Sequence, residues 1–129
     1  MNYNKCIFVG RLTRDPELRE VNGTNVVSFT IACNRSFKKK DGERSEKTLF
    51  MDAELWGPAA QIISDRAAKG KVILIDGPLE QDKFQAKDGS NRTRYKLRIE
   101  YFQIENGKRQ AAVSADGGEF AVNDEETFQ

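Results

Sequence analysis

Regular alternation of apolar and other side chains is the feature that most constrains how this chain folds. In residues 27–34, 47–56 and 94–101, an apolar residue recurs at every second position. A period of two residues sends alternate side chains to opposite faces of an extended backbone, so each segment predicts a β-strand with one buried face. Apolar runs in residues 5–13 and 71–79 predict two further strands. The chain is therefore expected to fold mainly as β-sheet.

Tight-turn sequences and one helical segment set the order of these strands. Polar loops at Asn22–Asn25, around Asp41-Gly42 and around Asp88-Gly89 lie between predicted strands, and Asp-Gly between strands favours a β-hairpin. Pro58 and Gly70 are placed to start and stop a short helix. We predict an all-β protein with the OB-fold, a five-stranded Greek-key barrel with one short helix between strands 3 and 4. An SH3-like barrel or a small α+β sheet also fits this pattern.

Formal charges are unevenly distributed along the chain, although their sum is only +1. Residues 1–109 hold all 21 Lys and Arg residues and 15 of the 20 acidic residues, a net charge of +6. Residues 110–129 hold five acidic residues and no basic one, a net charge of −5. This last segment has few large apolar side chains, which is typical of disorder. We predict a folded domain over residues 1–106 and a disordered acidic tail over residues 107–129.

Composition excludes several classes of protein. The chain has no histidine, which excludes His-dependent hydrolases and His-ligated metal enzymes. Its two cysteines, Cys6 and Cys33, are too few for a four-thiolate zinc site, so no metal or cofactor is expected. No segment approaches the ~18 apolar residues of a membrane span, and the first residues contain no secretory signal. We expect a cytoplasmic protein with no membrane partner and no enzymatic activity.

Two large aromatic side chains fall on the polar face of segment 47–56. Phe50 and Trp56 are six residues apart, so they point the same way as Asp52 and Glu54. One interpretation is that the helix or a second subunit covers this face. The other is a stacking platform for unpaired bases, because every base presents a π-face to an aromatic ring.

Lone aromatic residues also stand among basic residues elsewhere in the chain. Phe37 lies within the basic run 35–40, and Phe84 follows Lys83. Cations attract phosphates and exposed rings hold unpaired bases, so this combination predicts a site for single-stranded nucleic acid. The basic residues of segment 94–98 share one strand face, which suits either a phosphate backbone or an ordinary solvent-facing surface.

At these residues the chain resembles the bacterial-type single-stranded DNA-binding protein family. The resemblance covers about residues 1–104, in order and without large gaps, and its most specific block is residues 9–19. The residues that carry it are Asn4, Val9–Arg19, Gly23, Val27–Arg35, Phe50, Trp56-Gly57, Ala60, Lys69–Val72, Asp76–Leu79, Asp88-Gly89 and Arg92.

The resemblance implies an OB-fold protein that assembles as a homotetramer and binds single-stranded DNA without sequence preference. Such a protein coats and protects DNA during replication, recombination and repair. The base-stacking aromatics of the family correspond here to Phe37, Phe50, Trp56 and Phe84. Its basic groove implies phosphate contacts by seven residues: Arg11, Arg14, Arg35, Lys38, Lys71, Arg92 and Arg94.

The tip of the tail departs from the family pattern. Family members usually end in an acidic segment closed by Pro-Phe, through which replication and repair proteins are recruited. Here Thr127 takes the place of the proline and Gln129 follows the phenylalanine. The residues implied to bind partners are Asp124, Glu125, Glu126 and Phe128. The resemblance also implies a location in the bacterial cytoplasm, for a chain encoded by the chromosome, a phage or a plasmid.

Two other functions fit the sequence less well. A primosome-type accessory protein uses the same barrel and acts mainly through protein contacts. Such proteins tend to lack an acidic tip that contains Phe, whereas this chain has one. An enzyme without histidine needs a carboxylate or lysine site, and no paired carboxylates stand out in the sequence.

Overall fold

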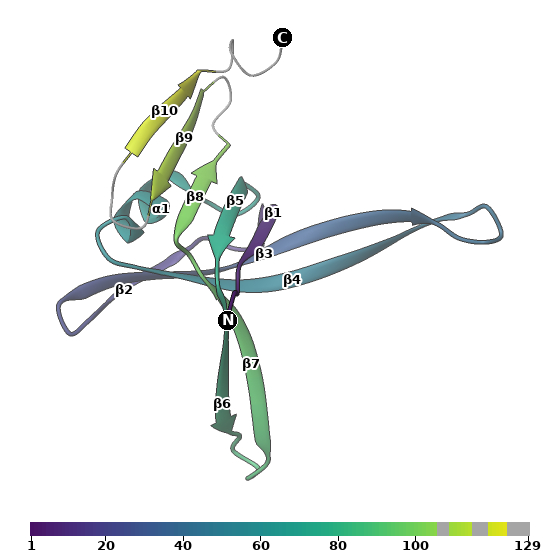
Figure 1. The fold of residues 1–129 in the computed structure, drawn as a ribbon, viewed down its shortest axis with the longest axis horizontal. Helices are drawn as coiled ribbons and strands as arrows, with labels where there is room; N and C mark the ends of the chain where they lie inside the picture. Colours follow the sequence, from purple (N-terminus) through teal and green to yellow (C-terminus); the bar gives the residue numbers. More distant parts are fainter. Residues whose placement is uncertain (106–108, 115–118, 124–129) are drawn as a thin grey trace.

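The computed structural model of the chain describes residues 1–105, 109–114 and 119–123. Within these residues the chain forms ten β-strands and one α-helix (Figure 1). In chain order the elements are β1 (Cys6–Leu12), β2 (Glu17–Val21), β3 (Thr24–Lys38), β4 (Arg44–Trp56), α1 (Ala60–Arg66), β5 (Val72–Gly77), β6 (Leu79–Gln85), β7 (Asn91–Arg98), β8 (Tyr101–Ile104), β9 (Arg109–Ser114) and β10 (Glu119–Asn123).

The described strands form one sheet in the order β10-β9-β8-β5-β1-β3-β4-β7-β6, with β2 paired to β3 beside this path. Five of them, β1, β3, β4, β5 and β8, lie next to one another in the order β8-β5-β1-β3-β4. Along the chain, α1 follows the third of these five and precedes the fourth. This is the predicted order of the OB-fold, and the all-β class is confirmed.

The sheet differs from a closed five-stranded barrel because it has additional strands and an open path. The edge of β4 that faces away from β3 pairs in parallel with β7, at Ala53–Leu97 and Glu54–Arg98. The Ile99 amide then donates to the Glu54 carbonyl at 2.9 Å. The predicted strand over residues 94–101 is therefore divided, because its first part pairs with β4 through β7 and its end with β5 through β8.

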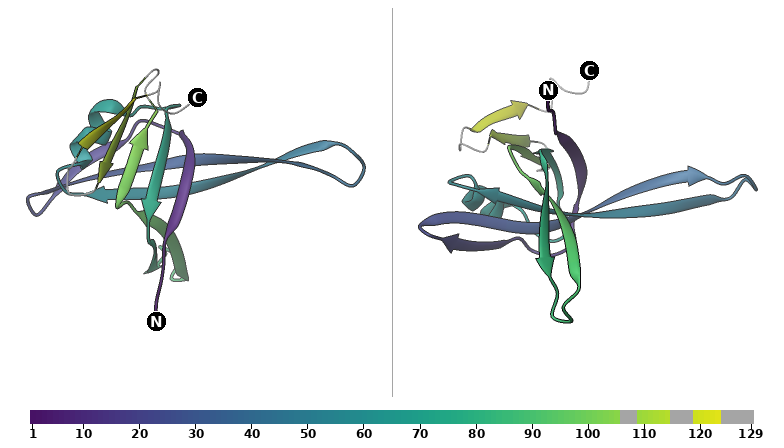
Figure 2. Two further views of the ribbon diagram at one scale, coloured as in Figure 1. Left: turned by 45° about the horizontal axis from the view of Figure 1, so that its top comes forward. Right: turned by 60° about the horizontal axis from the view of Figure 1, so that its bottom comes forward.

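Two long hairpins project from the body of the sheet in different directions (Figures 1 and 2). The β3–β4 hairpin pairs from Val26–Trp56 out to Lys38–Arg44, and the β6–β7 hairpin from Leu79–Leu97 to Gln85–Asn91. All three predicted turns are confirmed. At the β2–β3 turn both Asn22 and Gly23 have positive φ, 51° and 82°, which suits the twist of a two-residue hairpin.

The core lies where the inner halves of the strands meet α1. The alternation in β3 is confirmed, since Val27, Phe29 and Ile31 are buried. The helix is shorter than predicted at both ends. It begins at Ala60 rather than at Pro58, and Ala67 is already extended. The chain leaves the helix early because the Gly70 amide donates to the Leu12 carbonyl at 2.8 Å, which returns the backbone to β1. No helix in the described part is long and apolar enough to cross a membrane.

Two segments of the predicted tail lie within the described residues. Residues 109–114 form β9 against β8, and residues 119–123 form β10 against β9. An unpaired strand edge leaves a row of backbone donors and acceptors without partners. β9 supplies partners to the edge of β8 that faces away from β5, from Tyr101–Ser114 to Ile104–Ala111. The predicted partner-binding tip falls outside the described residues: Asp124, Glu125, Glu126 and Phe128.

Candidate nucleic-acid interface

One face of the β3–β4 ladder carries the first two predicted stacking residues. Phe50 pairs with Ala32, and Trp56 pairs with Val26. Residues paired across an antiparallel ladder point to the same side, so both rings leave this face. Phe50 is 63% exposed, so nothing in the described part of the chain covers it. Trp56 is partly exposed.

An open groove of about 320 Å³ follows the same face, and we call it the central groove. Its lining mixes cations and carboxylates in equal numbers. The cations are Arg14, Arg19, Arg94 and Lys96, and the carboxylates are Glu17, Asp52, Glu54 and Asp82. Two predicted phosphate contacts, Arg14 and Arg94, therefore lie together in this groove. The predicted basic face is crossed by acidic side chains that neutralise part of it.

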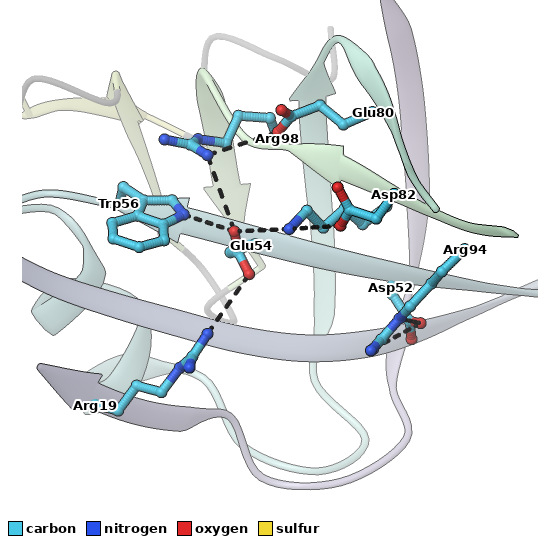
Figure 3. A network of polar contacts seen from close by, with 9 residues as sticks. Arg19, Asp52, Glu54, Trp56, Glu80, Asp82, Arg94 and Arg98 are labelled. Carbon is cyan, nitrogen blue, oxygen red and sulfur yellow. Dashed lines mark hydrogen bonds and ion pairs between the residues drawn. The ribbon is translucent and has the colours of Figure 1, made fainter. Parts of the chain in front are cut away.

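The carboxylate of Glu54 lies between several donors in this groove (Figure 3). The Trp56 indole Nε1–H donates to Glu54 Oε1 at 2.6 Å. Lys96 Nζ lies 3.3 Å from the same oxygen, Arg98 lies 3.9 Å from it, and Arg19 approaches Oε2 at 3.8 Å. Nearly buried polar groups are tolerated when they have such partners, so this network fixes the floor of the groove.

Asp52 forms an ion pair with one of the predicted phosphate ligands, Arg94. Its Oδ2 lies 3.2 Å from the Arg94 guanidinium, and its Oδ1 accepts the Thr30 hydroxyl at 2.6 Å. The Arg94 guanidinium on β7 thus points toward the Asp52 carboxylate on β4 (Figure 3). An incoming phosphate at Arg94 must share this cation with Asp52 or displace the carboxylate.

Two opposing influences act on the pKa of Lys96. Partial burial alone would lower the pKa of the Lys96 ammonium, because it disfavours the charged form. The hydrogen bond to Asp82 and the charge of Glu54 outweigh this effect, so the pKa of Lys96 is raised above its ordinary value. Lys96 therefore stays charged in the groove at neutral pH.

Cations also stack on two of the predicted aromatic residues. The Arg98 guanidinium carbon lies 5.1 Å from the centroid of the Trp56 ring, and that of Arg35 lies 5.8 Å from the Phe37 ring. Each contact is a cation–π arrangement, which places a positive charge beside an aromatic ring that was predicted to stack on a base. Phe37 pairs with Ser45, so it leaves the opposite side of the β3–β4 ribbon from Phe50.

The β6–β7 hairpin carries a separate site around Phe84. Phe84 pairs with Arg92 and is 47% exposed, and both line a hollow on this hairpin. Arg92 lies 3.6 Å from Asp88 in the turn. Hydrogen bonds from the side chain and the backbone amide of Ser90 lower the pKa of Asp88 and keep the turn in one shape.

The remaining predicted phosphate contacts lie outside the central groove. The Arg11 guanidinium donates to the Gly70 carbonyl at 3.0 Å, and the backbone of Lys71 is bonded to that of Leu12. Arg35 lines a hollow with Lys47, and Lys38 lies at the outer end of β3. The structure therefore distributes the seven predicted cations over the central groove, both hairpins and the end of β1.

Several residues that line the central groove were not predicted as functional from the sequence, among them Arg19, Asp52 and Glu54. A signal for the two acids was present, since Asp52 and Glu54 alternate with the aromatics on the face of Phe50 and Trp56. Arg19 had no such signal, because it approaches Glu54 only through the pairing of β2 with β3. The described residues contain no group of three or more His, Cys, Asp and Glu side chains placed to hold a metal ion.

The chain matches proteins named for single-strand binding over most of its length. The Single-strand binding protein family matches residues 3–105. A single-stranded DNA-binding protein of Helicobacter hepaticus is 37% identical over 82% of this chain, which spans 63% of that relative. One from Wolinella succinogenes is 35% identical over 95% of this chain and 76% of its own length.

A solved structure shares the same fold. The chain matches one titled Plasmodium falciparum SSB complex with ssDNA, with a TM-score of 0.74 over 82% of this chain and 97% of that one. The two sequences are 20% identical, so the likeness concerns the fold alone. The family match over residues 3–105, together with the two relatives at 37% and 35% identity, places the chain in the single-strand binding protein family.

Proposed function

We propose that the chain binds single-stranded DNA without sequence preference and coats and protects it during replication, recombination and repair. One observation carries the proposal. An exposed Phe50 and a partly exposed Trp56 share a strand face with a groove that four basic side chains line. The relatives named as single-stranded DNA-binding proteins support it.

The mechanism divides between rings and cations. Bases stack on Phe50, Trp56, Phe84 and Phe37, a contact that contributes about 1–3 kcal/mol per base in proteins that bind single strands. Stacked bases are withheld from pairing, and no base edge is read, so the contact tolerates any sequence. The phosphates follow basic side chains and release counterions, which makes the affinity dependent on salt. The proposed phosphate ligands are Arg11, Arg14, Arg35, Lys38, Lys71, Arg92 and Arg94.

In this proposal the chain is a binding module rather than an enzyme, and it needs no metal or cofactor. It works in the cytoplasm and recruits replication and repair proteins through Asp124, Glu125, Glu126 and Phe128.

The primosome-type alternative acts mainly through protein contacts. The exposed Phe50 favours the DNA-binding function, because a ring left on a charged face suits a base better than a buried protein interface.

We further propose that the chain assembles as a homotetramer in which β1 takes part. β1 pairs with β5 from Cys6 to Arg11, but it pairs with β3 only at Arg11 and Leu12. Its edge over residues 6–10 thus has no strand partner on the β3 side in the described part of the chain. Ile7 and Val9 lie on the same face of this strand and are 62% and 54% exposed. An open edge beside exposed apolar side chains suits pairing with a second copy.

The proposed function predicts a salt-dependent optical signal. Trp56 is the chain's single tryptophan, so its fluorescence reports on the central groove alone. Titration with oligo-dT is expected to quench this fluorescence, with an affinity that falls steeply as salt rises. Phe50→Ala should weaken binding by on the order of 10-fold, whereas Gln61→Ala on the exposed side of α1 should not. Absence of any salt-sensitive binding would refute the function.

A further inference from the structure

Glu54 is an unusual residue to find in the floor of a groove for a polyanion. Only 8% of its surface is exposed, and among the described residues no other polar or charged residue is as deeply buried. Burying a carboxylate is costly unless cations and hydrogen-bond donors surround it. Its negative charge also opposes phosphate binding nearby. A residue with both costs is expected to do something specific for the interface.

Its contacts point to the indole of Trp56. The Trp56 Nε1–H donates to Glu54 Oε1 at 2.6 Å, the shortest of the contacts that Glu54 makes in this network. The indole N–H is the only hydrogen-bond donor of a tryptophan side chain, so this one bond fixes the edge of the ring. In Figure 3 the indole edge points toward the carboxylate, with Arg19 approaching from the other side.

Arg98 completes the arrangement from above the ring. Its guanidinium carbon lies 5.1 Å from the Trp56 centroid, and the guanidinium lies 3.9 Å from Glu54 and 3.6 Å from Glu80. Glu54 therefore contacts both the edge of the indole and the cation stacked on its face. A ring held at its edge and on one face has its orientation set before a base arrives. Binding to such a ring costs less ordering entropy than binding to a freely rotating one.

We propose that Glu54 is a positioning residue of the single-strand interface, which holds the Trp56 indole in its stacking orientation through the Nε1 hydrogen bond. This inference rests on the proposed function of the central groove. Glu54 need not touch the nucleic acid, because it acts through Trp56. The property that matters is the acceptor oxygen at the position of Oε1, and not the negative charge.

Two substitutions of similar size separate the acceptor from the charge. Glu54→Gln removes the charge and retains an amide oxygen that accepts the indole N–H. Glu54→Leu removes both. Both variants gain the same electrostatic attraction for phosphates, so their difference reports on the acceptor oxygen. That oxygen also faces Lys96 and Arg98, and a Trp56→Phe background separates these contacts from the indole bond. Binding is measured by the anisotropy of a fluorescein-labelled dT oligomer at several salt concentrations, after urea unfolding has established that each variant folds.

We expect E54Q to bind at least as tightly as the wild type, most visibly at low salt. E54L should bind on the order of 10-fold more weakly than E54Q, within the range for loss of a stacking contact. In a Trp56→Phe background the ring remains but the N–H is gone. There the difference between E54L and E54Q should vanish, as a double-mutant cycle requires for residues that act together.

Equal affinities of E54L and E54Q in the Trp56 protein would overturn the proposal. So would a difference that persists after Trp56→Phe. If the wild type itself fails to bind the oligomer, the proposed function has failed instead, which keeps the two outcomes distinct.

A measurement on the unmodified protein covers the case in which E54L does not fold. The single tryptophan gives one indole N–H resonance in a nitrogen–proton correlation spectrum. If Glu54 holds this group, its hydrogen exchange is slow in the free protein and stays slow when the dT oligomer is bound. Exchange as fast as that of a solvent-exposed indole in either state contradicts the proposal.

Discussion

At the scale of single residues, Lys96 links the stability of the fold to pH. Lys96 contacts Glu54 and Asp82 at 3.3 Å and 3.0 Å, and its side chain is 22% exposed. Its pKa is raised in the folded chain, so folding favours the protonated ammonium. A raised pKa stabilises the fold at any pH below the ordinary pKa of lysine. This stabilisation is lost as pH rises through the higher pKa of the folded state.

Lys96→Met is therefore expected to lower the free energy of unfolding by about 1.5–3 kcal/mol at pH 7, the range for hydrogen bonds to charged groups. The difference from the wild type should shrink above the ordinary pKa of 10.5. Urea unfolding of both proteins from pH 7 to 11 measures it, and Lys87→Met in the exposed β6–β7 turn is the control. A difference that stays constant over this range would show that lost packing, and not the charge, is responsible.

The sequence predicted ring positions better than it predicted the partners of charged groups. The two-residue periodicity of segment 47–56 placed Phe50 and Trp56 on the polar face of a strand. This prediction requires only that the segment be extended, as it is in β4. The cluster at Glu54 includes Arg19 from β2 and Lys96 and Arg98 from β7. It therefore depends on how four strands pair, in the order β2-β3-β4-β7. No local sequence pattern predicts the register in which these strands pair. The individual roles of the predicted cations in the site stay predictions.

At the scale of elements, one crossing of backbones explains why the predicted strand over residues 94–101 is divided. The Arg98 amide donates to the Pro78 carbonyl at 2.9 Å, and the Glu100 amide donates to the Asp76 carbonyl at 2.8 Å. Gly77 lies between these two bonds, at the end of β5. Hairpin turns could be read from Asn-Gly and Asp-Gly pairs. The sequence gives no comparable signal for a place where the chain changes partners.

This crossing predicts that Gly77 tolerates no side chain. A Cβ atom there would overlap the Arg98 carbonyl oxygen and meet the Glu100 amide nitrogen at 3.1 Å, and both are backbone atoms that cannot turn away. Gly77→Ala should lower the free energy of unfolding by about 3 kcal/mol, the upper part of the usual range for overpacking.

Gly23→Asn is the matched control for this substitution. Nothing lies within 4 Å of a Cβ at Gly23, and asparagine tolerates its positive φ. We expect this variant to unfold at nearly the wild-type urea concentration. If G77A is as stable as G23N, the backbones at the crossing are not as tightly packed as the structure places them.

For the whole molecule, the central groove and the open edge of β1 lie on different strands. The central groove lies on the β3–β4 face, whereas Ile7 and Val9 lie on β1. In the proposed assembly, chains join through β1 and leave the central groove of each chain open for the proposed DNA ligand. Such an assembly lets one strand of DNA contact more than one groove, which raises overall affinity without any new contact in a single chain.

The assembly is tested by placing charge on β1. Light scattering of the wild type should give four times the chain mass of 14.6 kDa. Ile7→Lys combined with Val9→Lys should give a smaller assembly, because two ammonium groups would have to be buried in the shared edge. Tyr95→Lys is the control, since Tyr95 is similarly exposed at 52% but lies on β7. The same measurement with a dT oligomer shows how many chains share one strand. A wild-type mass of one chain, or an unchanged mass in the β1 variant, would exclude β1 as the surface of assembly.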